Sequence, residues 1–270
     1  MRFFASIRQW LGRNDGKHVP GFVKARANMA YSFIMPGRYL TARQQLPKAL
    51  EQRNDIRDRS MLDWLLDHLW WTWAFTEQYR ESEEFFSTYL ENYPNDARAY
   101  ELRGASLWYS GELRQAIEDY SKALELTPQD LIAHMGRGQV FAESGEFSRA
   151  IEDLDFVHDN LEQLQTGNSS WKMQIQAYSF SGRAVAHAGL GDFDRALSEF
   201  DRSIFLCPEN AFVYFNRAMV YEKMGRLGEA MAEYKISLQK NTPRLTPHVA
   251  VRPDRDPQPV RRFECFTADL

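Results

Sequence analysis

The sequence predicts an all-α protein, a solenoid in which helix–turn–helix hairpins stack side by side. Three observations lead to this prediction. Within residues 97–130, Tyr100, Gly104 and Leu107 recur at the spacing of one helix face. A similar pattern returns with a period of about 34 residues, which is typical of helical repeats. No segment shows the strict alternation that indicates a strand.

The remaining residues of this segment explain its hairpin. Gly111 lies where the chain turns, because a positive φ is cheap only for glycine. Ala116, Tyr120 and Ala123 form a small–large–small stripe on the second helix. Pro128 ends that helix, since proline cannot continue a helix interior. A pair of amphipathic helices still leaves one apolar face open, so each hairpin needs neighbours.

These residues resemble a tetratricopeptide repeat, and about two-thirds of the chain resembles that family. The resemblance covers a domain at residues 60–244, with repeats at about 63–96, 97–130, 131–164, 177–210 and 211–244. It implies a right-handed α-solenoid. It also implies a concave groove, lined by the first helix of each pair, that holds a peptide or helix of a partner protein.

A basic, helical N-terminal segment at residues 1–59 precedes the repeats. Residues 1–14 have the pattern of an amphipathic helix that packs on the first repeat, binds an anionic membrane surface or directs organelle import. Between residues 20 and 53 we expect two further helices, separated near Pro36. Pro47 kinks the second helix or marks its start.

A tryptophan-rich helix opens the first, degenerate repeat. Ser60 and Asp63 form its predicted start. Trp70 stands where Gly104 stands one repeat later, which argues against a close approach of the paired helix. The tryptophans surround the helix, so we expect core packing covered by the N-terminal segment rather than a ligand-binding aromatic box. They are Trp64, Trp70, Trp71 and Trp73.

The repeats are interrupted after residue 164. The copy at 131–164 lacks the closing proline, so we expect its second helix to continue through Leu164. A break at residues 166–168 precedes a helix that starts near Trp171. We therefore expect two long helices around 165–176 that protrude as a pair. Three apolar residues bridge the pair or form an exposed patch: Trp171, Met173 and Ile175.

Each clear copy has an arginine just before its small residue: Arg103, Arg137, Arg183 and Arg217. We expect each to pair with a carboxylate of the neighbouring helix, which is a structural role. The candidates are Glu118, Asp119, Glu152, Asp153, Glu199 and Glu233.

The tail at residues 245–270 is rich in proline and arginine, and we expect it to be irregular. No polar capping helix is evident after the last repeat. Either the tail folds back over the last repeat or a second chain covers it. The apolar residues available in the tail are Val249, Val251, Phe263 and Phe266.

Composition narrows the class of protein. The 270 residues are 44% hydrophobic and 26% charged, as in ordinary globular proteins. Two cysteines are too few for a disulfide framework, which favours a reducing, cytoplasmic location. No apolar run is long enough to span a membrane. Arg8 interrupts the start, which argues against a secretory signal.

In the register of the repeats, the groove would be lined by Arg98, Glu101, Tyr109, Met135, Gln139, Tyr178, Ser181, Phe212, Phe215, Asn216 and Met219. Part of the tetratricopeptide family binds a C-terminal carboxylate with Lys, Asn and Arg residues. Only Asn216 has one of these residue types in a suitable place here. The sequence therefore favours a mixed apolar and aromatic groove for an amphipathic helix or an extended apolar segment.

Catalytic motifs are missing from the sequence. The six histidines lie in different predicted elements, no pair has metal-binding spacing, and there is no C-x-x-C or phosphate-binding loop. We expect no enzyme activity, metal or cofactor. Scattered basic residues do not form a nucleic-acid patch.

Three functional hypotheses remain open at this point. The leading hypothesis is a cytoplasmic, protein-binding scaffold or adaptor that uses the groove. The second is a membrane-associated assembly factor held by residues 1–14. The third is a structural protein that self-associates through its uncapped end and forms a homo-oligomer.

Overall fold

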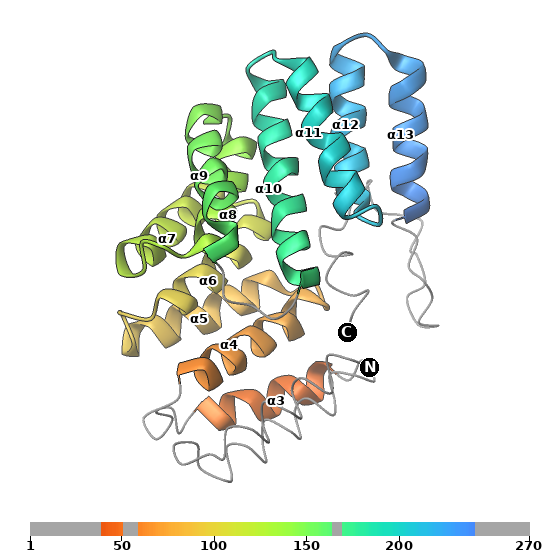
Figure 1. Cartoon of the computed structure of the whole chain (residues 1–270). Coiled ribbons are helices and arrows are strands. Elements are labelled where there is room, and N and C mark those ends of the chain that lie inside the picture. The colour runs from red at the N-terminus through yellow and green to blue at the C-terminus, as the bar shows by residue number, and fades with distance from the viewer. Residues whose placement is uncertain (1–38, 51–58, 164–168, 241–270) are drawn as a thin grey trace. The chain divides into compact units, whose positions relative to one another are not determined.

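The computed structural model describes residues 39–50, 59–163 and 169–240, and every regular element in these ranges is a helix (Figure 1). The predicted all-α class is confirmed. The chain divides into two compact units, residues 1–136 and 137–270. In each unit, helices that follow one another in the sequence pack together, as in an α-solenoid. The predicted helices before residue 39 and the tail after residue 240 lie outside the described residues.

Among the described residues, unit 1 holds helix α3, two helical hairpins and the start of a third. Its helices are α3 (Tyr39–Leu50), α4 (Arg59–Ala74), α5 (Tyr79–Asn92), α6 (Ala97–Ser110), α7 (Leu113–Leu126) and the first turns of α8 (Leu131–Ser144). Pro47 lies inside α3 and does not mark its start. α6 and α8 begin at the first residues of the repeats predicted at 97–130 and 131–164.

Unit 2 contains the rest of α8, α9 (Phe147–Asn160), the short 3-10 helix η2 (Leu161–Gln163), α10 (Ser169–Gly189), α11 (Phe193–Leu206), α12 (Ala211–Lys223) and α13 (Leu227–Lys240). α10 has 21 residues and α9 has 14. The expectation that the helix before the break continues through Leu164 is wrong, because α9 ends at Asn160 and one 3-10 turn follows. The extra length lies in α10, whose Ile175 is buried while Met173 stays exposed.

Turns and caps recur with the repeat. Gly111, Gly145, Gly191 and Gly225 all have φ between 73° and 87°, the left-handed conformation that glycine adopts without strain. First helices are capped by short polar side chains. Asp130 Oδ1 accepts hydrogen bonds from the backbone N–H groups of Ile132 (2.9 Å) and Ala133 (3.2 Å).

An arginine joins the two helices in each of the four clear copies of the repeat, as expected from the sequence. Arg103 binds Asp119 through both Nε and Nη2, at 2.7 Å each, and Arg137 binds Asp153 in the same two-pronged way at 2.7 and 2.8 Å. In the later copies the acid is a glutamate. Each glutamate is held by one nitrogen, Arg183 Nη2 to Glu199 at 3.2 Å and Arg217 Nη2 to Glu233 at 2.7 Å.

The same arginines also reach back to the preceding hairpin. Arg217 Nη1 pairs with Asp201 of α11 at 2.5 Å, and Arg183 Nη1 pairs with Asp155 of α9 at 3.3 Å. Arg103 Nη1 donates to Ser87 of α5 at 3.3 Å. One side chain therefore sets the distance both within a hairpin and between hairpins.

The tryptophan-rich helix α4 is part of the core of unit 1. Trp70 and Trp73 are buried, while Trp64 and Trp71 are half-buried. Trp70 points to the next hairpin, because its Nε1 donates to Ser106 Oγ of α6 at 3.0 Å. α3 covers α4 from the N-terminal side, where the ring of Tyr39 stacks on Phe75 with centroids 4.8 Å apart. The predicted core role of these tryptophans and their N-terminal cover are confirmed.

The arginine contacts can be tested by removing one acid. We expect Asp119→Ala to lower the free energy of unfolding of unit 1 by about 2–3 kcal/mol, because it leaves the Arg103 guanidinium partly buried without its partner. The adjacent, exposed Glu118→Ala is the matched control, and we expect a change below about 0.5 kcal/mol. Urea unfolding monitored by circular dichroism measures both, and equal effects would contradict the assignment.

Candidate binding surface

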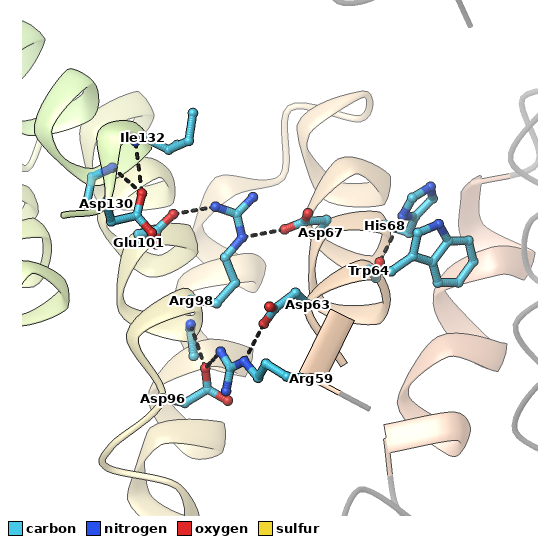
Figure 2. A network of polar contacts seen from close by, with 12 residues as sticks. Arg59, Asp63, Trp64, Asp67, His68, Asp96, Arg98, Glu101, Asp130 and Ile132 are labelled. Carbon is cyan, nitrogen blue, oxygen red and sulfur yellow. Dashed lines mark hydrogen bonds and ion pairs between the residues drawn. The ribbon is translucent and has the colours of Figure 1, made fainter. Parts of the chain in front are cut away.

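Two of the predicted groove residues in unit 1 form an internal ion-pair cluster instead (Figure 2). Glu101 is 3% exposed and pairs with Arg98, one helical turn before it. Arg98 Nε also binds Asp67 Oδ1 of α4 at 2.6 Å. These two side chains connect α4 to α6, so the structure places them between helices rather than on an open groove wall.

The cluster extends along α4. Arg59 Nε lies 2.8 Å from Asp63 Oδ1, and Arg59 Nη2 lies 2.7 Å from Asp96 Oδ1 (Figure 2). The second oxygen of Asp96 accepts a hydrogen bond from the Tyr89 hydroxyl at 2.9 Å. Asp96 also caps α6, so the same buried carboxylate takes part in a helix cap and in the ion pair with Arg59.

Glu101 is the electrostatically unusual member of the cluster. Burial raises the pKa of its carboxyl group well above the usual value, and the neighbouring Asp130 and Asp67 raise this pKa further. Arg98 opposes the shift. Glu101 therefore lies between a cation, Arg98, and a second carboxylate, Asp130, which caps α8.

The other two predicted groove residues of unit 1 are more accessible. Tyr109 is half-buried and stacks on Tyr79 of α5, with ring centroids 5.1 Å apart. Met135, in the first turns of α8, is also half-buried. Tyr109 therefore belongs to an aromatic contact between α5 and α6.

In unit 2, the predicted residues of α8 and α10 pack against each other. Gln139 Nε2 donates to the backbone carbonyl of Tyr178 at 3.2 Å. Tyr178 and Ser181 are both buried. Burial also raises the pKa of the Tyr178 phenol. Because these two side chains are covered, they offer little surface to a partner.

The predicted residues of α12 stay at the surface. Phe212, Phe215 and Asn216 are half-buried, and Met219 is 43% exposed. The ring of Phe215 leans on Tyr234 of α13, with centroids 5.4 Å apart, which fixes its direction. Spacings of three and four residues place Phe212, Phe215 and Met219 on one face of the helix. We call these three residues the α12 face.

A second apolar feature of unit 2 was missed by the sequence analysis. Phe205, near the end of α11, is 85% exposed. It borders an open pocket of about 440 Å³ that is also lined by Phe180 and Arg202. The guanidinium of Arg202 lies over the Phe180 ring, 5.6 Å from its centroid. The sequence did carry one signal for this feature, because helical periodicity places the aromatic Phe205 next to an exposed arginine and an exposed aspartate.

Within the described ranges, no group of three or more His, Cys, Asp or Glu side chains is arranged to hold a metal ion. The same residues include no helix that is long and apolar enough to cross a membrane. Neither finding adds a candidate site to the surfaces above.

The raised pKa of Glu101 predicts an unusual pH dependence. A carboxyl group with a raised pKa in the folded state destabilises the fold as pH rises from its unfolded value of about 4.3. Glu101→Gln keeps a neutral, hydrogen-bonding side chain. We therefore expect this variant to be more stable than the wild type at pH 8, with a difference that shrinks towards pH 5.

Urea unfolding at a series of pH values measures that difference. Glu118→Gln, an exposed position on α7, controls for loss of charge and should show no such trend. If Glu101 were ionised and held by Arg98, Glu101→Gln would instead be the less stable protein at pH 8.

Comparisons with known proteins agree with this architecture. The model of the tetratricopeptide repeat family matches residues 102–155 and 182–244. A tetratricopeptide repeat protein from Parabacteroides merdae superimposes with a TM-score of 0.57 at 20% identity, over 81% of this chain and 79% of that one. A thermophilic tetratricopeptide protein from Thermus thermophilus superimposes with a TM-score of 0.51 at 19% identity, over 73% of this chain and 98% of that one.

At these identities the solved structures establish the fold alone. No curated protein sequence matches this chain. The matched segments contain all of α7, α8, α11, α12 and α13, together with the four arginines and the second-helix acids that they bind. The hairpins in these segments are tetratricopeptide repeats, and the fold of the chain is that of proteins built from such repeats.

Proposed function

We propose that this chain is a non-catalytic adaptor that binds an amphipathic helix or an extended apolar segment of a partner protein. Tetratricopeptide repeats generally serve as protein-interaction scaffolds, which supports the class of function. The α12 face is the part of the predicted groove that supports the proposal most directly. It offers two aromatic side chains and one flexible methionine at the surface.

The main observation is a difference between first helices. The buried Glu101 of α6 and the buried Ser181 of α10 occupy the repeat position that Phe215 occupies in α12. The half-buried Met135 of α8 and Phe215 of α12 carry large apolar side chains at this position, and of the four copies only α12 has an aromatic ring there. Complete burial of one such side chain contributes on the order of 2 kcal/mol, so two or three contribute about 4–6 kcal/mol, which corresponds to a dissociation constant between about 1 mM and about 40 μM.

The chemistry of the face indicates the kind of partner. Rigid aromatic rings next to an adaptable methionine suit an apolar helix face or an extended segment with alternating apolar residues. Asn216, beside Phe215, provides a donor and an acceptor that can orient the partner's backbone. A partner that binds only through charge would gain little from this surface.

Peptide selection on the intact chain tests the proposal. Peptides of about 20 residues are selected by display on the wild-type protein, and their dissociation constants are measured by fluorescence anisotropy. We expect Met219→Ala and Phe215→Ala each to weaken the selected peptides by about tenfold, which corresponds to about 1.4 kcal/mol. The variant Phe205→Ala, which removes an exposed aromatic ring from a different face of the same unit, should leave binding unchanged.

The opposite pattern would overturn the proposal. If Phe205→Ala abolishes binding while Met219→Ala does not, the partner binds at the pocket on α10 and α11 instead. Because Phe215 also contacts Tyr234, thermal unfolding of each variant confirms that the fold is retained. Met219 has no ring contact to lose, so its variant keeps the test valid if Phe215→Ala is unstable.

A further inference from the structure

The open pocket between α10 and α11 lies where unit 2 departs from the other repeats. Phe205, at its edge, is 85% exposed. The equivalent positions of the other three clear copies hold exposed polar residues: Glu125, Asp159 and Gln239. A single exposed ring is common on protein surfaces, so its meaning depends on what surrounds it.

Two further departures from the repeat border the same pocket. Ser198 stands where α7 and α9 have the exposed acids Glu118 and Glu152. Gln176 lies inside α10, at the place where the first helices of the other three copies begin with a polar cap. Both residues line the pocket. The loss of a glutamate and the extra turns of α10 therefore meet beside the exposed ring.

The repeat also shows which charge is missing at this pocket. The equivalent of Arg202 in α7 is Lys122, whose Nζ pairs with Glu125 Oε2 on the same helix at 2.7 Å. In α11 the position of that acid is occupied by Phe205. The cation is therefore kept, while the carboxylate that would pair with it along the helix is replaced by an aromatic ring.

The contacts of Arg202 leave part of its guanidinium group to solvent, since its side chain is 58% exposed. Its Nη1 lies 3.8 Å from Glu199 Oε1, an oxygen that is already 3.2 Å from Arg183 Nη2. The guanidinium lies over the Phe180 ring, which orients it without using its N–H donors. An arginine oriented in this way can bind a carboxylate through two parallel hydrogen bonds.

An acid at the pocket, Asp201, does not cancel this charge. Its carboxylate pairs with Arg217 Nη1 of the next hairpin at 2.5 Å. Because α11 has neither of the acids that α7 carries at the positions of Ser198 and Phe205, the pocket favours an anionic ligand next to Arg202.

The size of the pocket limits the kind of ligand. A volume of about 440 Å³ is in the lower part of the range of about 300–1,000 Å³ for ligand sites, so it suits one or two side chains rather than a helix. An open site encloses a free small molecule poorly, whereas an extended polypeptide also gains from the apolar rim. That rim includes Phe205 and Met173, which is 45% exposed and lies one turn before Gln176 on the same face of α10.

We propose that the pocket between α10 and α11 is a second docking site, which takes an acidic residue and an adjacent aromatic residue from an extended segment of a partner protein. The carboxylate binds Arg202 in the place of the acid that α7 supplies itself. The aromatic side chain packs between Phe180 and Phe205. This site is separate from the α12 face and does not depend on it.

NMR titration of the isotope-labelled full chain tests the site. The probes are three blocked peptides, GSEWLSG, GSQWLSG and GSKWLSG, which differ only in charge next to the tryptophan. We expect GSEWLSG to shift amides of residues 176–180 and 198–206 with a dissociation constant below about 1 mM. The glutamine peptide should bind at least about fivefold more weakly, and the lysine peptide weakest of the three, because only the glutamate can pair with Arg202.

Variants of exposed residues assign the contacts. Phe205→Glu restores the acid of α7 and should weaken GSEWLSG at least about tenfold. Arg202→Ala should abolish the difference between the glutamate and glutamine peptides, which loss of packing alone would not do. Leu190→Glu, which adds the same charge at an exposed position elsewhere in unit 2, is the matched control and should leave binding unchanged. Met219→Ala on the α12 face should also leave it unchanged.

Several outcomes would overturn the proposal. If millimolar GSEWLSG leaves these amides unshifted, or if the three peptides bind equally, the pocket does not recognise such a segment. If Met219→Ala weakens GSEWLSG as much as Phe205→Glu does, the peptide binds the α12 face, and the adaptor function stands while this second site fails. Tighter binding of an oligo(dT) strand, lost in Phe205→Glu, would assign the pocket to single-stranded nucleic acid.

The tail of the chain is the remaining competitor. Cys207, two residues after Phe205, is disulfide-bonded, and the other cysteine of the chain, Cys265, belongs to the tail. The titration is therefore repeated with Cys265→Ser. If this variant binds GSEWLSG and the wild type does not, the pocket belongs to the chain's own tail and not to a partner. Equal binding by the two proteins supports the partner.

Discussion

The ion pair between each first-helix arginine and the acid on the second helix is the constraint on which the stack depends. Arg103 and Arg137 grip aspartates with two hydrogen bonds each, while Arg183 and Arg217 hold longer glutamates end-on. A buried carboxylate is costly without a partner, so the hairpin must keep the arginine in place. Gly104 lies beside this contact, and an added Cβ would come within 3.3 Å of Asp119 Cβ. Close approach of the helices and pairing of the charges therefore require each other.

Because the arginine also contacts the preceding hairpin, it transmits the repeat along the chain. Asp155 and Asp201 accept from the arginine that follows them, and apolar rows such as that of α11 fill the space beside these pairs. The interior is thus nearly identical from copy to copy, and variation is left to the first-helix faces. In unit 1 the variable first-helix positions form the cluster around Arg98 and Glu101, which joins α4 to α6. In unit 2 it leaves Phe212, Phe215 and Met219 of α12 at the surface, where binding energy is available.

The contacts that recur along the stack are different at its two ends. α4 replaces the small residue with Trp70, whose indole donates to Ser106 on α6, and α3 covers the other side of α4. At α13 the apolar row is kept, but the position that receives the next arginine is Lys235.

The sequence alone determined the all-α class, the turn glycines and the arginines that bind the second helix, while it left two candidate acids each for Arg103 and Arg137. All of these follow from local spacing, which every copy repeats. It did not determine how accessible a first-helix position is. Glu101, Tyr178 and Ser181 have the periodicity of a groove but are buried. Other helices supply the neighbouring contacts, since Asp67 of α4 binds Arg98 and Gln139 of α8 donates to the Tyr178 carbonyl. The sequence also predicted a longer helix α9 than the structure has, because the absence of a proline permits a longer helix without requiring one. Tertiary packing decided these points, because burial and charge pairing depend on side chains that are distant in sequence and have no local period.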